Sequence, residues 1–180
     1  MTMLKYGGKF DNKAYKTSGG LHGIGVKAVN FLSQWCEVEV RRDGHVYQQE
    51  YERGKPTNPV AKIGTSSSTG TKTTFKPDPD VFGNLKFDYS ILHRRLQELA
   101  FLNRGVKIIF TDDRSGDGET FQYENGLVEF VQYLNRASDT AHEVVYIHSP
   151  IPDADVTVEA AFQYSAEYTE NVQTLSLIHI

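Results

Sequence analysis

The stretch Tyr15-Lys16-Thr17-Ser18-Gly19-Gly20-Leu21-His22-Gly23-Ile24-Gly25-Val26 decides the fold, because a polar, glycine-dense run opens here directly into an apolar helical pattern. Glycine adopts backbone angles closed to other residues, and its missing side chain lets backbone N–H groups approach an anion. The free N–H groups and positive dipole end of the following helix favour negative charge, so the stretch is typical of a polyphosphate-binding loop. The predicted buried side of that helix consists of Val26, Ala28, Val29, Phe31 and Leu32.

Two common phosphate-binding patterns do not fit this stretch. A P-loop requires Gly-x-x-x-x-Gly-Lys-Ser/Thr, which occurs nowhere in the chain, and the dinucleotide fingerprint requires Gly-x-Gly-x-x-Gly after a hydrophobic strand. Here the spacing is reversed, as Gly20-x-x-Gly23-x-Gly25, and the preceding residues 11–18 are too polar for a buried parallel strand. A structural turn before a helix is the alternative interpretation, and spacing alone does not decide between the two.

Composition and charge indicate a globular chain that does not bind DNA tightly. Its 180 residues are 39% hydrophobic and 12% aromatic, which is enough for one core or for one domain and part of another. The formal net charge is −4 and no long Lys/Arg run occurs. The sequence therefore shows no basic segment of the kind that binds DNA phosphates tightly.

The single cysteine and the absence of long apolar runs indicate in which cellular compartment the protein is found. Cys36 has no partner for an internal disulfide, which is typical of a reducing cytoplasm, and we interpret it as a semi-buried strand residue rather than a nucleophile. No apolar run approaches membrane-spanning length, and no signal segment follows Met1. We therefore expect a cytoplasmic protein with no membrane partner.

Alternating residues predict a meander of antiparallel strands in the first half of the chain. An Asp-Gly pair at Asp43-Gly44 joins the first two of these runs and is a strong hairpin signal. Pro77 and Pro79 end the last of them. The expected strands are 37–41, 45–51, 60–63 and 72–75.

Two helices and a further hairpin are expected in the second half. Leucines three and four residues apart predict a helix over residues 90–103, with Asp88 or Ser90 as N-cap, and a second helix follows from Leu127 to Leu134. Strands at 106–110 and 119–123 flank an acidic loop. We interpret this loop as a solvated turn rather than a calcium site, because the closing glutamate is missing.

Several segments occur in the same order as in one known family. They resemble the ATP lid and following elements of the bacterial type IIA topoisomerase ATPase subunits, members of the GHKL superfamily. The similarity runs from about Met3 to about Thr174, and its last segment favours the gyrase branch over the topoisomerase IV branch. The matching segments are Gly7-Gly8-Lys9-Phe10-Asp11, Tyr15-Lys16, Ser18–Val26, Asn30-x-Leu32-Ser33, Gly70-Thr71 and Leu99–Val106.

The resemblance implies an α+β fold and a domain division. The fold would be the C-terminal part of a GHKL-type two-layer α/β sandwich, followed by the start of a ribosomal-S5-like transducer domain. We assign residues 1–136 to the partial ATPase domain, 137–142 to a linker and 143–174 to the transducer. Residues 175–180 match one reading frame of a sequencing-library adapter, so we expect them to be a non-native tail.

The resemblance also implies a set of ATP-binding residues. Backbone amides from Leu21 to Gly25 would wrap the triphosphate, and the two lysines would pair with its outer oxygens. The tyrosine would touch the nucleoside and the threonine would reach adenine directly or through water. His22 receives a binding role, not that of a catalytic base. The predicted ATP-binding residues are Lys9, Tyr15, Lys16, Gly20, Leu21, His22, Gly23, Ile24, Gly25 and Thr71.

Arg42 corresponds by position to the arginine at the pocket mouth, where coumarin antibiotics bind family members. A surface arginine at the end of a hairpin is the alternative interpretation. For Lys9 and Lys16 the corresponding alternative is a solvated surface charge.

No catalytic residue and no metal ligand is assigned in this sequence. The family's general-base glutamate, the asparagine that bridges Mg²⁺ and the aspartate that recognises adenine correspond to positions upstream of the region of resemblance. The glutamine and lysine that sense the γ-phosphate correspond to positions downstream. We therefore expect the 180-residue chain, taken alone, not to hydrolyse ATP.

The resemblance implies the function of the intact protein. It would use ATP binding and hydrolysis, with Mg²⁺, to drive passage of one DNA duplex through another and so supercoil DNA. The implied partners are the DNA-cleaving gyrase A protein in a heterotetramer, a second copy of the chain when ATP binds, and double-stranded DNA through other regions. The alternatives are a topoisomerase IV ATPase protein, a non-catalytic GHKL nucleotide-binding switch, and a purely structural module.

Overall fold

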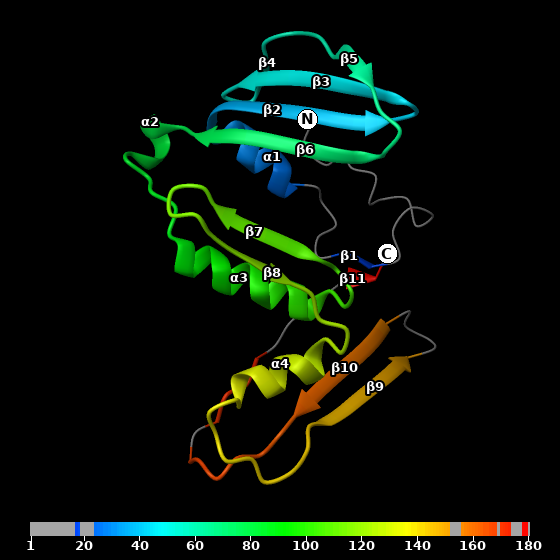
Figure 1. Cartoon of the computed structure of the whole chain (residues 1–180), viewed down its shortest axis with the longest axis vertical. Coiled ribbons are helices and arrows are strands. Elements are labelled where there is room, and N and C mark those ends of the chain that lie inside the picture. Colours follow the sequence, from blue (N-terminus) through cyan, green and yellow to red (C-terminus); the bar gives the residue numbers. More distant parts are fainter. Residues whose placement is uncertain (1–16, 19–23, 152–155, 169, 174–177, 180) are drawn as a thin grey trace. The chain divides into compact units, whose positions relative to one another are not determined.

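The computed structural model describes residues 17–18, 24–151, 156–168, 170–173 and 178–179 of the chain. The chain divides into two compact units (Figure 1). Unit 1 comprises residues 1–86 and 175–180, and unit 2 comprises residues 87–174. The division into ATPase domain, linker, transducer and non-native tail stays a prediction.

A five-stranded antiparallel sheet forms most of unit 1. Its strands run in the order β4-β3-β2-β6, and β5 also pairs with β3. Four of these elements confirm the strands expected from alternation: β2, β3 and β6 extend beyond the expected bounds, β5 is displaced towards the C-terminus, and β4 was not expected. The strands are β2 (Ser33–Arg42), β3 (His45–Glu52), β4 (Lys55–Pro56), β5 (Ala61–Thr65) and β6 (Gly70–Pro77). A separate two-stranded pair joins β1 (Thr17–Ser18) to β11 (Ile178–His179).

The predicted hairpin between β2 and β3 is confirmed. Asp43 and Gly44 have φ angles of 52° and 77°. A two-residue turn that matches the twist of its strands requires positive φ at both central residues, and Asp-Gly supplies them at low cost.

The pairing register divides the sheet into two faces. In β2, Cys36 lies opposite Tyr51 and Phe75, and Val40 lies opposite Tyr47 and Thr71. Because side chains alternate along a strand, these residues share one face. This Thr71 face consists of Cys36, Val38, Val40, Arg42, His45, Tyr47, Gln49, Tyr51, Thr71, Thr73 and Phe75. The opposite Trp35 face consists of Trp35, Glu37, Glu39, Arg41, Val46, Gln48, Glu50, Glu52, Lys72, Thr74 and Lys76.

Cys36 is more deeply buried than the sequence indicates. Its exposed fraction is 1%, and burial raises the pKa of its thiol. A buried thiol with a raised pKa is less reactive, which agrees with a packing role.

Helix α1 (Ile24–Phe31) contacts β2 and β6 (Figure 1), but its predicted buried side is wrong. Lys27 and Asn30, which lie on one face of the helix, are its buried residues. Val26, Phe31 and Leu32 are exposed, whereas Ala28 and Val29 are half-buried. Apolar spacing predicts the helix but does not identify which face the neighbouring strands cover.

A charged cluster ties the β3–β4 turn to α2 (Pro79–Phe82). Arg53 Nε lies 2.7 Å from Asp78 Oδ2, and the same guanidinium also pairs with Asp80. Asp78 caps α2 by accepting a hydrogen bond from Asp80 N at 3.0 Å. The Asp78 backbone N–H donates to the Leu32 carbonyl at 3.0 Å, so one buried carboxylate residue joins three segments.

Unit 2 packs two helices against two hairpins. Asp88 caps the longer helix, because its side chain accepts a hydrogen bond from Ile91 N at 3.1 Å, and this confirms one of the two predicted caps. The buried core centres on Phe101, which stacks on Tyr123 with 3.6 Å between ring centroids. The elements are α3 (Tyr89–Leu102), β7 (Ile108–Asp112), β8 (Asp117–Phe121), α4 (Leu127–Leu134), β9 (Val145–Ile151) and β10 (Val156–Phe162).

The turn between β7 and β8 is held by an ion pair, and we expect this pair to make the hairpin acid-sensitive. Hydrogen bonds from the Arg114 side chain and backbone lower the pKa of Asp112 from 3.8 to about 2. A lowered folded-state pKa stabilises the fold above pH 3.8, and this contribution is lost as the pH falls towards 2.

The Arg114→Gln variant should therefore lose less stability than the parent chain between about pH 4 and pH 2. Urea denaturation at a series of pH values measures this difference. Lys107→Gln, which removes an exposed positive charge from the same unit, is the control and should keep the parent pH dependence. Parallel acid profiles for the parent and Arg114→Gln would contradict the assignment.

Candidate functional site

Most of the predicted ATP-binding residues lie outside the described part of the chain. The described ones are Ile24, Gly25 and Thr71, together with Arg42 at the predicted pocket mouth. The predicted residues outside the described part are Lys9, Tyr15, Lys16, Gly20, Leu21, His22 and Gly23.

Ile24 and Gly25 form the start of α1. The first turn of a helix leaves backbone N–H groups without helical partners. The first turn of α1 contains no acidic side chain to compete for them. A Cβ built on Gly25 would meet no atom of the described residues within 4 Å. The start of α1 therefore has the room and the polarity that an anionic group requires.

Thr71 and Arg42 lie on the same face and at the same end of the sheet. Thr71 pairs with Val40, and Arg42 follows Val40 by two residues on β2, so both point to the Thr71 face. Both residues are exposed. The Thr71 hydroxyl has no hydrogen-bond partner among the described residues, which leaves its donor and acceptor free for a ligand.

Arg42 is only weakly held. Its Nε lies 3.3 Å from Asp43 Oδ2, with side-chain exposures of 76% and 78%. Pairs this exposed contribute little to stability, so the guanidinium can turn towards a ligand at small cost. The helix that begins at Ile24 contacts β2 and β6, the strands that carry Arg42 and Thr71.

Three further residues share this end of the Thr71 face and were missed by the sequence analysis. Tyr47 pairs with Val40, Lys62 pairs with Tyr47, and His45 pairs with Arg42. His45 Nδ1–H donates to the Asp43 carbonyl at 2.6 Å, which leaves Nε2 for other partners. Only the pairing register places these side chains together, because alternation alone does not fix which strands are neighbours.

The described residues of the candidate site present hydroxyl and cationic side chains on one exposed sheet face. The described part of the chain includes no group of three or more His, Cys, Asp or Glu side chains arranged to hold a metal ion. Hydroxyl and cationic groups on an exposed sheet face can orient a planar, anionic ligand by hydrogen bonds and charge. Among the helices of the described residues, none is long and apolar enough to cross a membrane.

The known proteins that are similar to this chain belong to one class of enzyme subunit. No family model matches the chain. The B subunit of DNA gyrase from Clostridium acetobutylicum is 50% identical over 173 residues, which cover 96% of this chain and 27% of that protein. The gyrase B subunit of Thermotoga maritima is 48% identical over 177 residues, covering 95% and 28%. The B subunit of DNA topoisomerase 4 from Bacillus subtilis is 46% identical over 173 residues, covering 96% and 26%.

A solved structure gives the same result for the fold. The crystal structure of the 43K ATPase domain of Thermus thermophilus gyrase B in complex with an aminocoumarin matches with a TM-score of 0.74 and 37% identity. The match covers 82% of this chain and 40% of that one. The chain thus spans about a quarter of the length of the curated relatives and less than half of the matched domain.

The structural match identifies the class of protein. The chain has the α+β fold of part of a GHKL-type ATPase domain, as the sequence predicts. Within that class, it is similar in sequence to a segment of DNA gyrase B and of the B subunit of DNA topoisomerase 4. The recognition of the gyrase-type ATPase proteins from the lid and the following segments is thereby confirmed.

Proposed function

We propose that the chain is part of an ATP-hydrolysing gyrase B protein that drives DNA strand passage and supercoiling. The observation that carries this proposal is the 44–50% identity to DNA gyrase B along almost the whole chain, together with the ATPase-domain fold. The exposed hydroxyl of Thr71 and the loosely held guanidinium of Arg42, at one end of one sheet face, support a nucleotide site there.

The proposed roles of the individual residues follow from their chemistry. Thr71 hydrogen-bonds the adenine directly or through water, and Arg42 borders the pocket mouth. Backbone N–H groups up to Ile24 and Gly25 surround the triphosphate, where the start of α1 adds its positive dipole end. Lys9 and Lys16 neutralise its outer oxygens, and Tyr15 contacts the nucleoside. The lid residues from Gly20 to Gly23 complete the site.

Mg²⁺ would neutralise phosphate charge and help to position the attacking water. The described residues provide no carboxylate cluster for it. We therefore propose that its ligands and the general base belong to the part of the gyrase B protein that corresponds to positions upstream of the resemblance.

The proposed partners are those of a gyrase. The gyrase A protein cleaves and rejoins DNA in a cytoplasmic heterotetramer, and ATP binding joins two gyrase B proteins into a clamp around the passing duplex. Lid closure on ATP is then the gating step that couples nucleotide to strand passage. The alternative is a topoisomerase IV ATPase protein, because curated relatives named as the B subunit of DNA topoisomerase 4 reach 45–48% identity.

A chimera tests this proposal. Residues 3–174 replace the matching segment of C. acetobutylicum gyrase B, and the product is assayed with the gyrase A protein of the same organism. We expect ATP-dependent supercoiling. A folded chimera that binds no nucleotide, or that binds ATP without supercoiling DNA, would contradict the proposal.

Within that chimera, Thr71→Ala should raise the KM for ATP by about three- to tenfold, because one buried hydrogen bond to the bound base is lost. Thr74→Ala is the matched control, since Thr74 lies on the same strand but on the Trp35 face. We expect its KM to stay within about twofold of the parent value. Equal effects of the two changes would show that Thr71 does not contact the nucleotide.

A further inference from the structure

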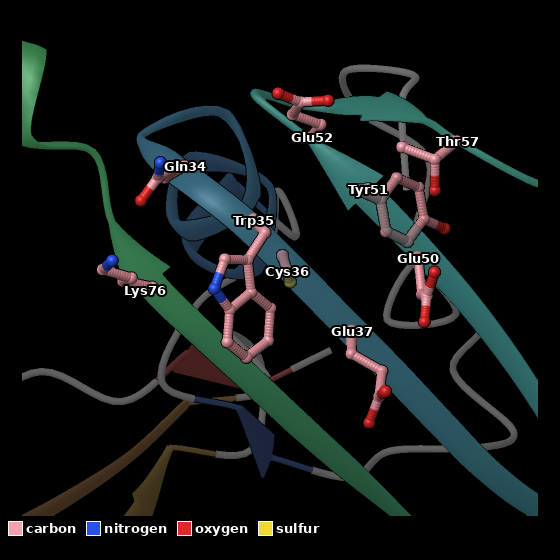
Figure 2. Close-up of a pocket in the computed structure, with 9 residues that line it drawn as sticks. All are labelled: Gln34, Trp35, Cys36, Glu37, Glu50, Tyr51, Glu52, Thr57 and Lys76. Atoms are coloured by element: carbon pink, nitrogen blue, oxygen red, sulfur yellow. The ribbon is translucent and has the colours of Figure 1, made fainter.

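A cavity of about 500 Å³ in unit 1 is lined by Trp35, Glu37, Glu50, Glu52 and Lys76 of the Trp35 face, together with Gln34, Cys36, Tyr51 and Thr57 (Figure 2). Among the described residues of the proposed nucleotide site, neither Thr71 nor Arg42 lines it. Figure 2 shows Trp35 and Glu37 extending from β2, with Glu50 and Glu52 on β3. The charged or aromatic residues that line it are Trp35, Glu37, Glu50, Tyr51, Glu52 and Lys76.

The charges around this cavity are unbalanced. Glu37 lies directly opposite Glu50, and like charges at such positions destabilise a sheet. Glu52 and Lys76 flank Trp35 on the two neighbouring strands. Three carboxylates thus face one ammonium group, and in the described part of the chain none of these four side chains forms an ion pair. A cationic ligand would remove the repulsion between Glu37 and Glu50.

Two of the carboxylates are held in place by neutral donors. Gln48 Nε2 donates to Glu37 Oε2 at 2.8 Å, and Asn58 Nδ2 donates to Glu50 Oε2 at 3.3 Å. The side-chain oxygen of Asn58 in turn accepts from Glu50 N at 3.1 Å. Among the described residues, Oε1 of Glu37 and Oε1 of Glu50 have no partner, so each carboxylate presents one free oxygen.

Trp35 adds an aromatic surface beside these oxygens. It is 42% exposed, although indole is among the largest apolar groups and is usually covered. The face of an indole ring attracts cations, and arginine both stacks on such rings and donates hydrogen bonds to two carboxylate oxygens at once. Tryptophan is also one of the residues enriched in interaction hot spots.

We propose that this surface binds an arginine-rich, extended segment of a partner protein, with one guanidinium group seated between Trp35 and the carboxylates of Glu37 and Glu50. Glu50 and Glu52 follow each other on one face of β3, where same-face residues lie about 7 Å apart. An extended segment has the same spacing between alternate side chains. A basic residue at every second position therefore matches the carboxylates along the strand.

Trp35 provides a direct measurement, because it is the only tryptophan of the chain. The probe is a peptide of alternating arginine and serine without aromatic residues, titrated into the 180-residue chain. We expect a saturable change in tryptophan emission that weakens steeply as salt is added. A serine peptide of equal length should cause no change. No change with the arginine peptide up to about millimolar concentration would overturn the proposal.

Matched variants locate the contact. Glu37→Gln and Glu50→Gln should each weaken peptide binding by about tenfold, and Lys76→Gln should strengthen it because a competing cation is removed. Glu39→Gln is the control, since Glu39 lies on the same face but pairs with Arg41 at 2.9 Å and does not line the cavity. Equal weakening by Glu39→Gln would indicate attraction to general negative charge and would overturn the site.

Two further measurements separate folding and ligand class from binding. Far-UV circular dichroism shows whether each variant keeps the parent fold, and a labelled peptide followed by anisotropy allows Trp35→Phe to be tested. We expect Trp35→Phe to weaken binding by about three- to tenfold. Spermidine that binds as tightly as the peptide would show that the cavity takes free polyamines and would overturn the assignment of a protein segment.

Discussion

Replacing Gly54 with alanine is expected to lower the free energy of unfolding of unit 1 by about 3 kcal/mol, from backbone strain and a steric clash together. Gly54 has a φ angle of 80°, where L side chains are strained. A Cβ built on it would lie 2.1 Å from Cδ1 of Phe31 and 2.6 Å from Cε1, so the ring must move. Trp35, the sole tryptophan, lies in unit 1 and reports its unfolding in urea.

A second glycine separates the two causes. Gly44 has a φ angle of 77°, but a Cβ there would meet nothing within 4 Å. Gly44→Ala should therefore cost only about 1 to 2 kcal/mol, the backbone part alone. In a Phe31→Ala background, the loss of unfolding free energy caused by Gly54→Ala should fall to a similar value, because the Phe31 ring is absent. Equal costs for Gly44→Ala and Gly54→Ala in the parent chain would show that the Phe31 contact is absent.

The elements that were predicted correctly depend on local chemistry. The β2–β3 hairpin follows from Asp43-Gly44, whose positive φ angles any such turn requires. The start of α3 follows from Asp88, whose side chain reaches Ile91 N within one turn. Strand alternation in the sheet is equally local. These features are determined by residues within a few positions of each other.

The features that were missed depend on which segments become neighbours. The predicted buried side of α1 was Val26, Ala28, Val29, Phe31 and Leu32, of which Ala28 and Val29 are half-buried and the other three exposed. The buried residues of the helix are Lys27 and Asn30. The Arg53–Asp78 pair joins residues 25 positions apart, and nothing in the local pattern of either residue indicates it. Hydrophobic periodicity identifies an element, but tertiary packing selects its buried face.

The candidate site also contains residues that the sequence predicts and residues that only the tertiary structure reveals. Thr71 and Arg42 were assigned from family resemblance, and the register places both on one sheet face. Tyr47, His45 and Lys62 were not assigned, because their place on the same end of the Thr71 face depends on strand order. The acidic cavity around Trp35 was missed for the same reason, since Glu37 and Glu50 meet only across β2 and β3.

Replacing Phe101 with alanine should have the largest effect on unit 2, with a loss of about 3 to 5 kcal/mol in the free energy of unfolding. Phe101 is 2% exposed and lies at the centre of an aromatic cluster. Its ring centroid lies 3.6 Å from that of Tyr123, 5.1 Å from that of Phe130 and 5.5 Å from that of Tyr133. Replacing it removes the ring contacts that it makes with α4 and with the segment after β8. The cavity left by the missing ring can close only if both segments move.

Leu99 provides the matched control, because it lies on the same helix and is 48% exposed. Leu99→Ala removes a leucine from the predicted apolar row yet should cost less than about 1 kcal/mol. Since unit 2 contains no tryptophan, amide hydrogen exchange of α3 and α4 measures the two effects. If Leu99→Ala were as damaging as Phe101→Ala, the leucine row would be the buried side of α3 and the aromatic cluster would not be the core of unit 2.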